Sequence, residues 1–185
     1  MAGKILTVQV KKEDKFLREK TKEFKFFKKS AQAAGRELSF KEIDELLREM
    51  RRTMREARGV GLSANQIGLP YRLFVAEVPD AQGSVKFYAV FNPRLEFPKK
   101  EKAVMEEGCL SVPGKYGFVE RVTSVKLNGV DKRGRAVKIK AWGLLAHVFQ
   151  HEVDHLEGKL FIDKAKEIFD VPRSERLIKK ESDLK

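Results

Sequence analysis

The sequence predicts an α+β fold in which antiparallel sheets pack around a central helix. Segments with the pattern of strands follow one another in pairs and do not alternate with helices, which favours α+β over a βαβ arrangement. One later segment is helical and apolar nearly all round, so we expect it in the middle of the domain. The chain has 185 residues, of which 42% are hydrophobic, enough for a single core.

A strand, a loop and a helix are expected before residue 60. ILTVQV at 5–10 has the pattern of a short strand. The lysine-rich segment 11–30 is expected to be a loop anchored to the core by its aromatic residues, with contact to RNA as an alternative. Ser39 followed by Glu42 is a capping box, which predicts a helix over about residues 40–57. Its apolar stripe is expected in the core and comprises Phe40, Ile43, Leu46, Leu47, Met50 and Met54.

Two hairpins and a second helix follow. Strands over 72–78 and 85–91 flank the turn PDAQGS, and strands over 119–127 and 136–142 flank NGVDKRGR. The second helix covers about residues 143–157 and ends at Gly158. We expect one domain over residues 1–163, followed by a charged and partly disordered tail over 164–185.

The charge balance restricts the class of protein. Lys and Arg number 39 and Asp and Glu 27, giving a net charge of +12. This charge suits a polyanion such as RNA or an anionic membrane face, although a well-solvated surface explains it equally well. No apolar run reaches the ~20 residues of a membrane helix. The sequence shows no signal peptide or organelle presequence and a single cysteine, Cys109, so a reducing cytoplasm is expected.

All three histidines lie in the second helix, at His147, His151 and His155. Each step of four residues advances ~6 Å and turns the helix face by ~40°. His151 and His155 can therefore reach one metal ion, whereas His147 is ~12 Å from His155 along the axis. Glu152 completes the pattern H-E-x-x-H, in which the glutamate acts as general base on a metal-activated water. The alternative is a helix with two histidines at the core edge and a surface glutamate.

A catalytic metal needs a third protein ligand and an open position for water. The sole cysteine is the candidate, and Cys109 lies in the segment MEEGCLSVPG. A lone buried cysteine is more often a small apolar filler of the core. The residues alone leave both interpretations of Cys109 open.

Three segments resemble the signature motifs of the peptide deformylase family. They are GVGLSANQ at 59–66, EGCLSVPG at 107–114 and QHEVDHLEG at 150–158, and the resemblance covers about residues 14–163. The family removes the formyl group from the N-terminal methionine of nascent bacterial or organellar proteins. The sequence departs from the family pattern at Ser63, usually alanine, at Tyr116, often arginine, and at Glu120, where proline is common.

The resemblance implies the roles of the reacting groups. Cys109, His151 and His155 would hold one metal ion, most often Fe(II) in the family and replaceable by Zn, Ni or Co. Glu152 would accept and return a proton. The Gln66 side-chain amide and the backbone N–H of Leu110 would bind the oxyanion.

The resemblance also implies how an N-formyl-methionyl peptide binds. The backbone of Val60, Gly61 and Leu62 would pair with the extended peptide, close to Gly108. The methionine side chain would enter an apolar pocket lined by Met105, Leu144 and Val148. His147 is expected at the rim of this pocket, or else is a half-exposed histidine without a role. Glu107 and Arg121 would form an ion pair that steadies the cysteine loop or a ligand histidine.

Other functions remain open from the sequence. The chain could be an HExxH peptidase that cuts inside polypeptides, a metal-binding or ribosome-associated module without activity, or an inactive relative of the family. The net charge motivates contact with the ribosome surface, and a monomer without membrane contact is favoured.

Overall fold

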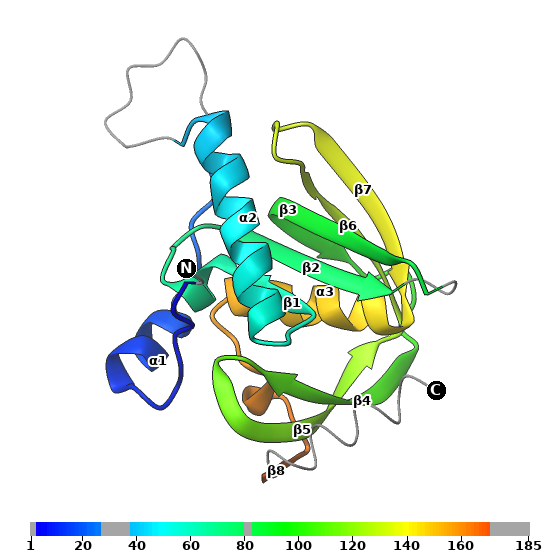
Figure 1. Cartoon of the computed structure of the whole chain (residues 1–185). Helices are drawn as coiled ribbons and strands as arrows, with labels where there is room; N and C mark the ends of the chain where they lie inside the picture. The colour runs from blue at the N-terminus through cyan, green and yellow to red at the C-terminus, as the bar shows by residue number, and fades with distance from the viewer. Residues whose placement is uncertain (1–2, 27–37, 80–82, 171–185) are drawn as a thin grey trace.

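The computed structural model describes residues 3–26, 38–79 and 83–170. Two antiparallel sheets enclose one helix, α3 (Gly143–Leu156), which lies between them in Figure 1. The five-stranded sheet has the order β1 (Gly61–Ser63), β2 (Leu73–Pro79), β3 (Val85–Glu96), β6 (Ser124–Val130), β7 (Ala136–Trp142). The three-stranded sheet has the order β4 (Lys102–Cys109), β5 (Val112–Val122), β8 (Glu167–Asp170). The α+β prediction with antiparallel sheets is confirmed.

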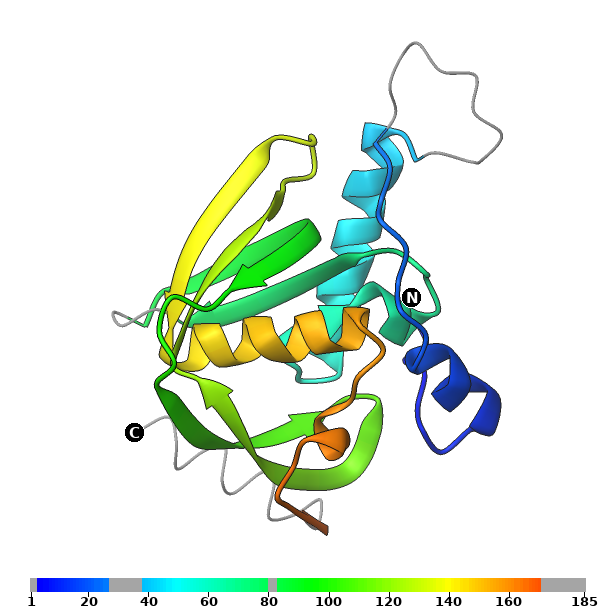
Figure 2. The same ribbon diagram turned by 180° about the vertical axis from the view of Figure 1, so that it is seen from behind.

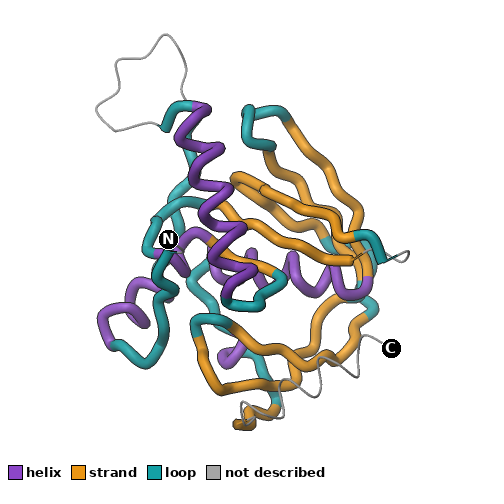
Figure 3. Tube along the Cα trace, viewed as in Figure 1, coloured by secondary structure: helices purple, strands orange, loops and turns teal. Residues whose placement is uncertain are grey.

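Strand β2 is buried on both faces because a helix covers each side of the five-stranded sheet. Phe74 and Ala76 contact the core shared with α3, and Leu73 and Val75 contact the core under α2 (Phe40–Glu56). Successive side chains of a strand point to opposite faces, so the two helices lie on opposite faces. Figure 3 shows this arrangement of helices around the strands.

The capping box at the start of α2 is confirmed. The Ser39 side chain accepts from the Glu42 backbone, and the Glu42 side chain accepts from the Ser39 backbone N–H at 2.8 Å. Ile43, Leu47, Met50 and Met54 form the predicted buried stripe, with Leu46 half-buried beside them. Phe40 was expected in the core but is 59% exposed, because the first turn of the helix extends beyond the sheet that covers the later turns.

Strands β5 and β6 belong to different sheets and are joined by a single residue, Thr123. The predicted strand over 119–127 is therefore wrong, since β5 ends at Val122 in one sheet and β6 begins at Ser124 in the other. The Gln150 side chain on α3 holds the joint, because it accepts from Val122 N–H at 3.2 Å and donates to Val122 O at 2.8 Å. The backbone N–H of Gly143 donates to Thr123 O at 3.1 Å.

The N-terminal segment differs from its prediction. Residues 5–10 form no strand, because Leu6 N–H donates to Gln66 O and Val8 N–H to Ser111 O, two separate segments. A short helix, α1 (Lys11–Leu17), replaces the first part of the expected loop. Phe24 is 4% exposed and packs edge-to-face on three aromatic rings, those of Phe26, Tyr71 and Phe91, which supports the anchoring role. Figure 2 shows α1, in dark blue, on the opposite side of the molecule from β7, in yellow. Residues 27–30 lie outside the described part.

The fold continues past the predicted boundary at residue 163. A 3-10 turn, η2 (Phe161–Asp163), leads to β8, which pairs with β5 from Lys115↔Asp170 to Phe118↔Glu167. Residues 171–185 of the predicted tail lie outside the described residues. None of the helices in the described segments has the length and hydropathy needed to cross a bilayer.

Candidate metal centre

Three donor atoms from two elements converge at the boundary between the sheets. Cys109 is the last residue of β4, and His151 and His155 lie one turn apart on α3. Their ligand atoms lie within 4.8 Å of one another, and Cys109 Sγ is 3.1 Å from His155 Nε2. Donors at ~2.0–2.3 Å from a tetrahedral ion are roughly 3–4 Å apart, so this spacing fits one ion. One sulfur and two nitrogens are the donors that borderline-soft divalent metals prefer.

Both histidines direct the same ring nitrogen, Nε2, to the donor cluster. His151 Nδ1 lies 2.7 Å from Glu107 Oε2, which leaves its Nε2 available to a cation. His155 presents Nε2 to Cys109, and the backbone carbonyl of His155 accepts from Asn65 Nδ2 at 2.7 Å. This contact fixes the end of α3 that carries the second ligand. Sequence reasoning missed Asn65, although it lies inside the GVGLSANQ motif.

The sulfur is held as a thiolate. Burial raises the pKa of the Cys109 thiol. The charge of His155 and the hydrogen bonds from His151 and His155 have a larger and opposite effect, and the resulting pKa is about 5. The pKa of His151 is raised well above its ordinary value, because contacts with Cys109 and Glu107 outweigh the effect of burial. A thiolate at neutral pH is the form that binds metals.

Behind His151 lies a chain of charged groups that runs from the buried Glu107 to the exposed Lys164. Glu107 and Arg121 form an ion pair through Arg121 Nε and a second contact from Nη2 at 3.0 Å. Arg121 Nη1 also donates to Asp154 Oδ2 at 2.7 Å, and Lys164 Nζ donates to the same oxygen at 2.6 Å. Burial raises the pKa of Glu107, yet Arg121 and the histidines hold it far below its usual range. The carboxylate therefore stays charged and orients the His151 ring.

His147 also lies against Glu107. Its imidazole is 8% exposed, and Nε2 is 2.5 Å from Glu107 Oε1, a close contact without the alignment of a hydrogen bond. The alternative of a half-exposed histidine is therefore wrong. Burial of His147 arises because α3 is covered by β4 and β5 at this turn, which periodicity within α3 did not reveal.

Glu152 is buried beside the donor cluster. It is 3% exposed, and Ser63 Oγ donates to its Oε2 at 2.7 Å. A Cβ at Gly61 would lie 2.2 Å from Oε1, so the carboxylate fits only against a glycine. Burial raises the pKa of Glu152, although His151, His155 and Ser63 act in the opposite direction. A raised pKa suits a group that takes up and returns a proton near neutral pH.

The Gln66 amide is oriented by its neighbours. Its Oε1 accepts from Ser63 N–H at 2.8 Å, and its Nε2 donates to Ser111 Oγ at 3.1 Å and lies 3.6 Å from Cys109 Sγ. Leu110 follows Cys109 in the turn before β5, and a Cβ at Gly59 would be 2.8 Å from its Cδ1. Gln66 and the Leu110 backbone thus flank the sulfur from two different loops.

The predicted substrate-binding residues divide into two groups. Val60 and Leu144 are exposed by 48% and 43%, and Met105 is half-buried. The side chains of Leu62 and Val148 belong to the two cores, so Leu62 can offer a peptide only its backbone, and the Val148 side chain is buried at 6% exposure. β1 is the edge strand of its sheet, which leaves one side of that backbone without a partner strand in the described residues.

Two of the three departures from the family pattern, Tyr116 and Glu120, occupy structural positions. The Tyr116 ring packs over Gly108, where a Cβ would lie 2.8 Å from Tyr116 Cε1, and stacks on Phe169 with centroids 6.4 Å apart. Glu120 pairs with Lys102 at 3.0 Å and Lys166 at 3.1 Å. Both residues therefore tie the three-stranded sheet together.

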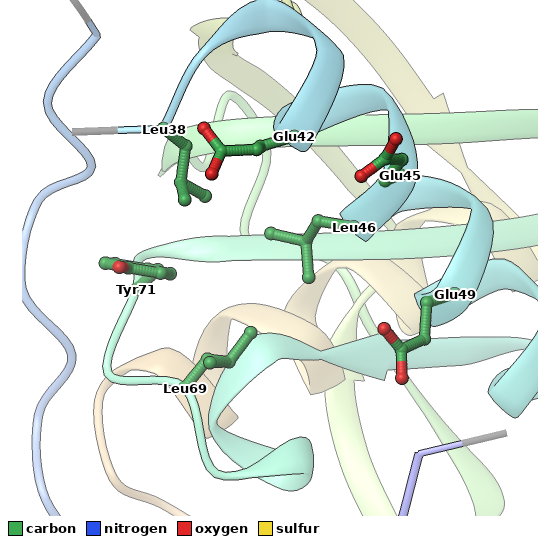
Figure 4. Close-up of a pocket in the computed structure, with 7 residues that line it drawn as sticks. All are labelled: Leu38, Glu42, Glu45, Leu46, Glu49, Leu69 and Tyr71. Atoms are coloured by element: carbon green, nitrogen blue, oxygen red, sulfur yellow. The ribbon is translucent and has the colours of Figure 1, made fainter. Parts of the chain in front are cut away.

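A cavity of about 330 Å³ lies away from the donor cluster, beside α2 and the segment 69–71 (Figure 4). Its lining contains none of the predicted site residues and consists of Leu38, Glu42, Glu45, Leu46, Glu49, Leu69 and Tyr71.

The fold and the site define a metal-dependent hydrolase with its HExxH pattern on a buried helix. The profile of the polypeptide deformylase family matches residues 7–169. The chain belongs to the peptide deformylase family, whose members are hydrolases that remove the N-formyl group from newly made peptides.

Individual relatives agree with this assignment. The chain is 45% identical over 119 residues to a peptide deformylase of Halothermothrix orenii, covering 64% of this chain and 75% of the relative. It is 46% identical over 123 residues to a peptide deformylase of Rhizobium meliloti, covering 66% and 70%. The crystal structure of the Thermotoga maritima peptide deformylase superimposes with a TM-score of 0.74 at 32% identity, covering 90% of this chain and 99% of that one.

Proposed function

We propose that this chain deformylates N-formyl-methionyl peptides with one Fe(II) ion held by Cys109, His151 and His155, with Zn, Ni or Co as possible substitutes. The observation that carries the proposal is the approach of three donor atoms within 4.8 Å, beside the buried carboxylate of Glu152. A thiolate donor and two neutral imidazoles suit Fe(II) as well as Zn. A reducing cytoplasm would keep Cys109 available as a ligand.

The reaction is the hydrolysis of an amide bond. The bound ion would act as a Lewis acid and lower the pKa of water toward neutrality. Glu152 accepts a proton from the attacking water at Oε1, the oxygen that Ser63 does not engage. Gln66 Nε2 and Leu110 N–H donate hydrogen bonds to the oxyanion that forms on the formyl oxygen. The C–N bond then breaks, formate leaves, and Glu152 returns its proton to the α-amine.

Substrate recognition combines a sheet edge with side-chain contacts. The open edge of β1 at Val60 and Gly61 supports pairing with an extended peptide, with the backbone of Leu62 continuing this edge. Leu144 on α3 and Met105 on β4 are accessible and would contact the methionine side chain, with Val148 one turn further along α3 toward His151. Gly108 precedes Cys109 on β4, and we place it beside the peptide. His147 would act through Glu107 at the base of this region.

The proposal is tested by anaerobic purification, metal analysis and an assay of formate release. Formyl-Met-Ala-Ser should release formate. The N-acetylated peptide acetyl-Met-Ala-Ser should not be hydrolysed. The Glu152→Gln variant should keep its metal and lose about 10²–10⁴ in rate, the typical contribution of a general base. Cleavage inside the polypeptide, or full activity of Glu152→Gln, would contradict the proposal.

We also propose contact with ribosomal RNA through the outward face of β6 and β7. Lys126 and Lys140 are directly opposite each other, Lys138 lies opposite Asn128, and Trp142 on the same face is 72% exposed. No ion pair engages these three lysines within the described residues. Glu96, which lies opposite Lys126, accepts from Asn128 Nδ2 at 2.9 Å. Lysines that neutralise phosphates beside an exposed aromatic ring are typical of RNA-binding surfaces.

Trp142 is the sole tryptophan of the chain, so its fluorescence reports on this face. Titration with ribosomal RNA should quench the fluorescence with an affinity that falls steeply with salt. Replacing Lys126, Lys138 and Lys140 with Glu should abolish binding, whereas the same change of three other exposed lysines, Lys99, Lys100 and Lys159, should weaken it less. Equal losses in both triple variants, or preferential binding to anionic vesicles, would contradict this contact.

A further inference from the structure

Ser63 connects the two side chains that the proposed reaction uses. It is fully buried at the junction of β1 and η1 (Ala64–Ile67). Its Oγ lies 2.7 Å from Glu152 Oε2 and 3.0 Å from the Glu152 backbone oxygen. Its backbone N–H donates to Gln66 Oε1 at 2.8 Å. One residue thus contacts both the proposed proton carrier and the proposed oxyanion donor.

The Glu152 carboxylate has few other constraints. Among the described residues, the Ser63 hydroxyl is its one hydrogen-bond partner, although the side chain is 3% exposed. The other carboxylate oxygen, Oε1, faces the α-carbon of Gly61, which offers no hydrogen bond. The terminal torsion of a glutamate is broad and is not fixed by rotamer preference. A change at Ser63 therefore acts directly on the orientation of this carboxylate.

We propose that Ser63 is a positioning residue that holds the Glu152 carboxylate in the orientation needed for proton transfer. A hydroxyl carries one proton and two lone pairs, so it can donate to the ionised carboxylate and accept from the protonated one. In the second case its own proton turns to the Glu152 backbone oxygen at 3.0 Å. The hydroxyl thus gives this chain a constraint on the carboxylate that the alanine usual at this position in the family does not supply. The inference rests on the proposed role of Glu152.

The first test is the Ser63→Ala variant, which removes the hydroxyl and keeps the backbone bond to Gln66. We expect kcat to fall about tenfold to a hundredfold, the scale of a misplaced reacting group. KM, the metal content and the affinity for the product peptide Met-Ala-Ser should remain within about twofold of the wild type, as a defect in orientation requires. The matched control is Thr21→Val, because Thr21 Oγ1 is a buried hydroxyl that donates to Leu156 O of the same helix at 2.9 Å. This control should lower Tm and leave kcat unchanged.

A double-mutant cycle separates positioning from general destabilisation. If Ser63 acts through the carboxylate, Ser63→Ala should change the residual rate of Glu152→Gln by less than about twofold. The same tenfold loss in both backgrounds would overturn the inference, and so would an unchanged kcat in Ser63→Ala. Full activity of Glu152→Gln would instead contradict the proposed function.

If Ser63→Ala does not fold, the isosteric pair Ser63→Thr and Ser63→Val provides the same comparison. Both variants add similar volume at a buried position, and the threonine alone keeps a hydroxyl. We expect the threonine variant to exceed the valine variant about tenfold in kcat at equal metal content. Equal kcat values in the pair would overturn the inference.

Discussion

The α-carbon of Gly61 lies against the carboxylate of Glu152. A Cβ at residue 61 would be 2.2 Å from Oε1 and 2.8 Å from Cδ of Glu152. The family resemblance implies that the Gly61 backbone pairs with the substrate peptide, and the structure adds a separate reason for a glycine at this position. A side chain at residue 61 and the observed position of Glu152 exclude each other.

We therefore expect Gly61→Ala to displace Glu152. The methyl group forces a buried carboxylate to move, which costs roughly 1–3 kcal/mol of unfolding free energy as an overpacked site. kcat should fall at least about tenfold because the proton carrier is misplaced. Steady-state kinetics and urea unfolding measure the two effects. Gly3→Ala is the control, since its Cβ would find only contacts at 3.5 Å or more; a fully active Gly61→Ala would contradict the expectation.

Removal of the thiolate should remove the metal. We expect Cys109→Ala to purify with little bound ion, since losing a ligand weakens binding more than the ~10–100-fold that loss of an outer partner costs. Metal analysis by mass spectrometry and the rate of formate release report the loss. Ser124→Ala, a buried hydroxyl on β6, is the control and should retain one ion per chain. An unchanged metal content in Cys109→Ala would exclude the sulfur as a ligand.

Neutralising Glu107 should affect both the metal and the fold. Glu107→Gln leaves Arg121 without its main counter-charge, which costs roughly 3–5 kcal/mol for a buried pair. The metal affinity should fall about 10–100-fold because His151 loses its orienting carboxylate. Urea unfolding of the metal-free protein isolates the first effect, and competition with a chelator measures the second. Glu167→Gln, on the exposed strand β8, should change neither quantity.

Glu77 should make stability depend on pH in the acid range. Burial raises the pKa of Glu77. The hydrogen bonds and charges of Arg55 and Arg51 outweigh this effect, so the pKa lies below its ordinary value. A lowered folded-state pKa adds stability above the unfolded pKa of about 4.3, and this stability is lost as pH falls through the folded-state pKa. The side chains of Arg51 and Arg55 are 40% and 58% exposed, respectively, so we expect these ion pairs to add about 1 kcal/mol to the unfolding free energy at pH 7.

The comparison of wild type with Glu77→Gln checks this linkage. The difference in unfolding free energy should be present at pH 7 and should shrink as pH falls from about 4.3 through the folded-state pKa, below which the carboxyl is protonated in both states. A difference that is the same at both pH values would indicate a packing effect and not an ionic one.

Local signals in the sequence predicted part of the fold well. The capping box at Ser39 and the turns of the two hairpins gave α2, β2 and β7 nearly at their observed bounds, and gave the start of β3, which continues past its predicted end at residue 91 to Glu96. These features depend on residues close in sequence, whose hydrogen bonds and periodicity are visible without the fold. The bend at Thr123 has no such signal, because the apolar alternation continues from β5 into β6.

The same distinction holds for the site. The HExxH spacing predicts that His151 and His155 share a face, and the helix places their ring centroids 4.9 Å apart. The contact between Ser63 and Glu152 joins residues 89 positions apart, so no local pattern contains it. The burial of His147 against Glu107 likewise depends on how β4 crosses α3.

The joint at Thr123 has a consequence for turnover. Gln150 and Gly143 pin both sides of this joint to α3, and Gln150 is the neighbour of His151 in the chain. The sheet that supplies the sulfur is therefore held against the helix that supplies the imidazoles. We expect the donor geometry to be assembled before a peptide binds. The peptide site that we propose lies along the open edge of β1, so we expect the cycle time to be governed by chemistry and product release and not by closure of a lid.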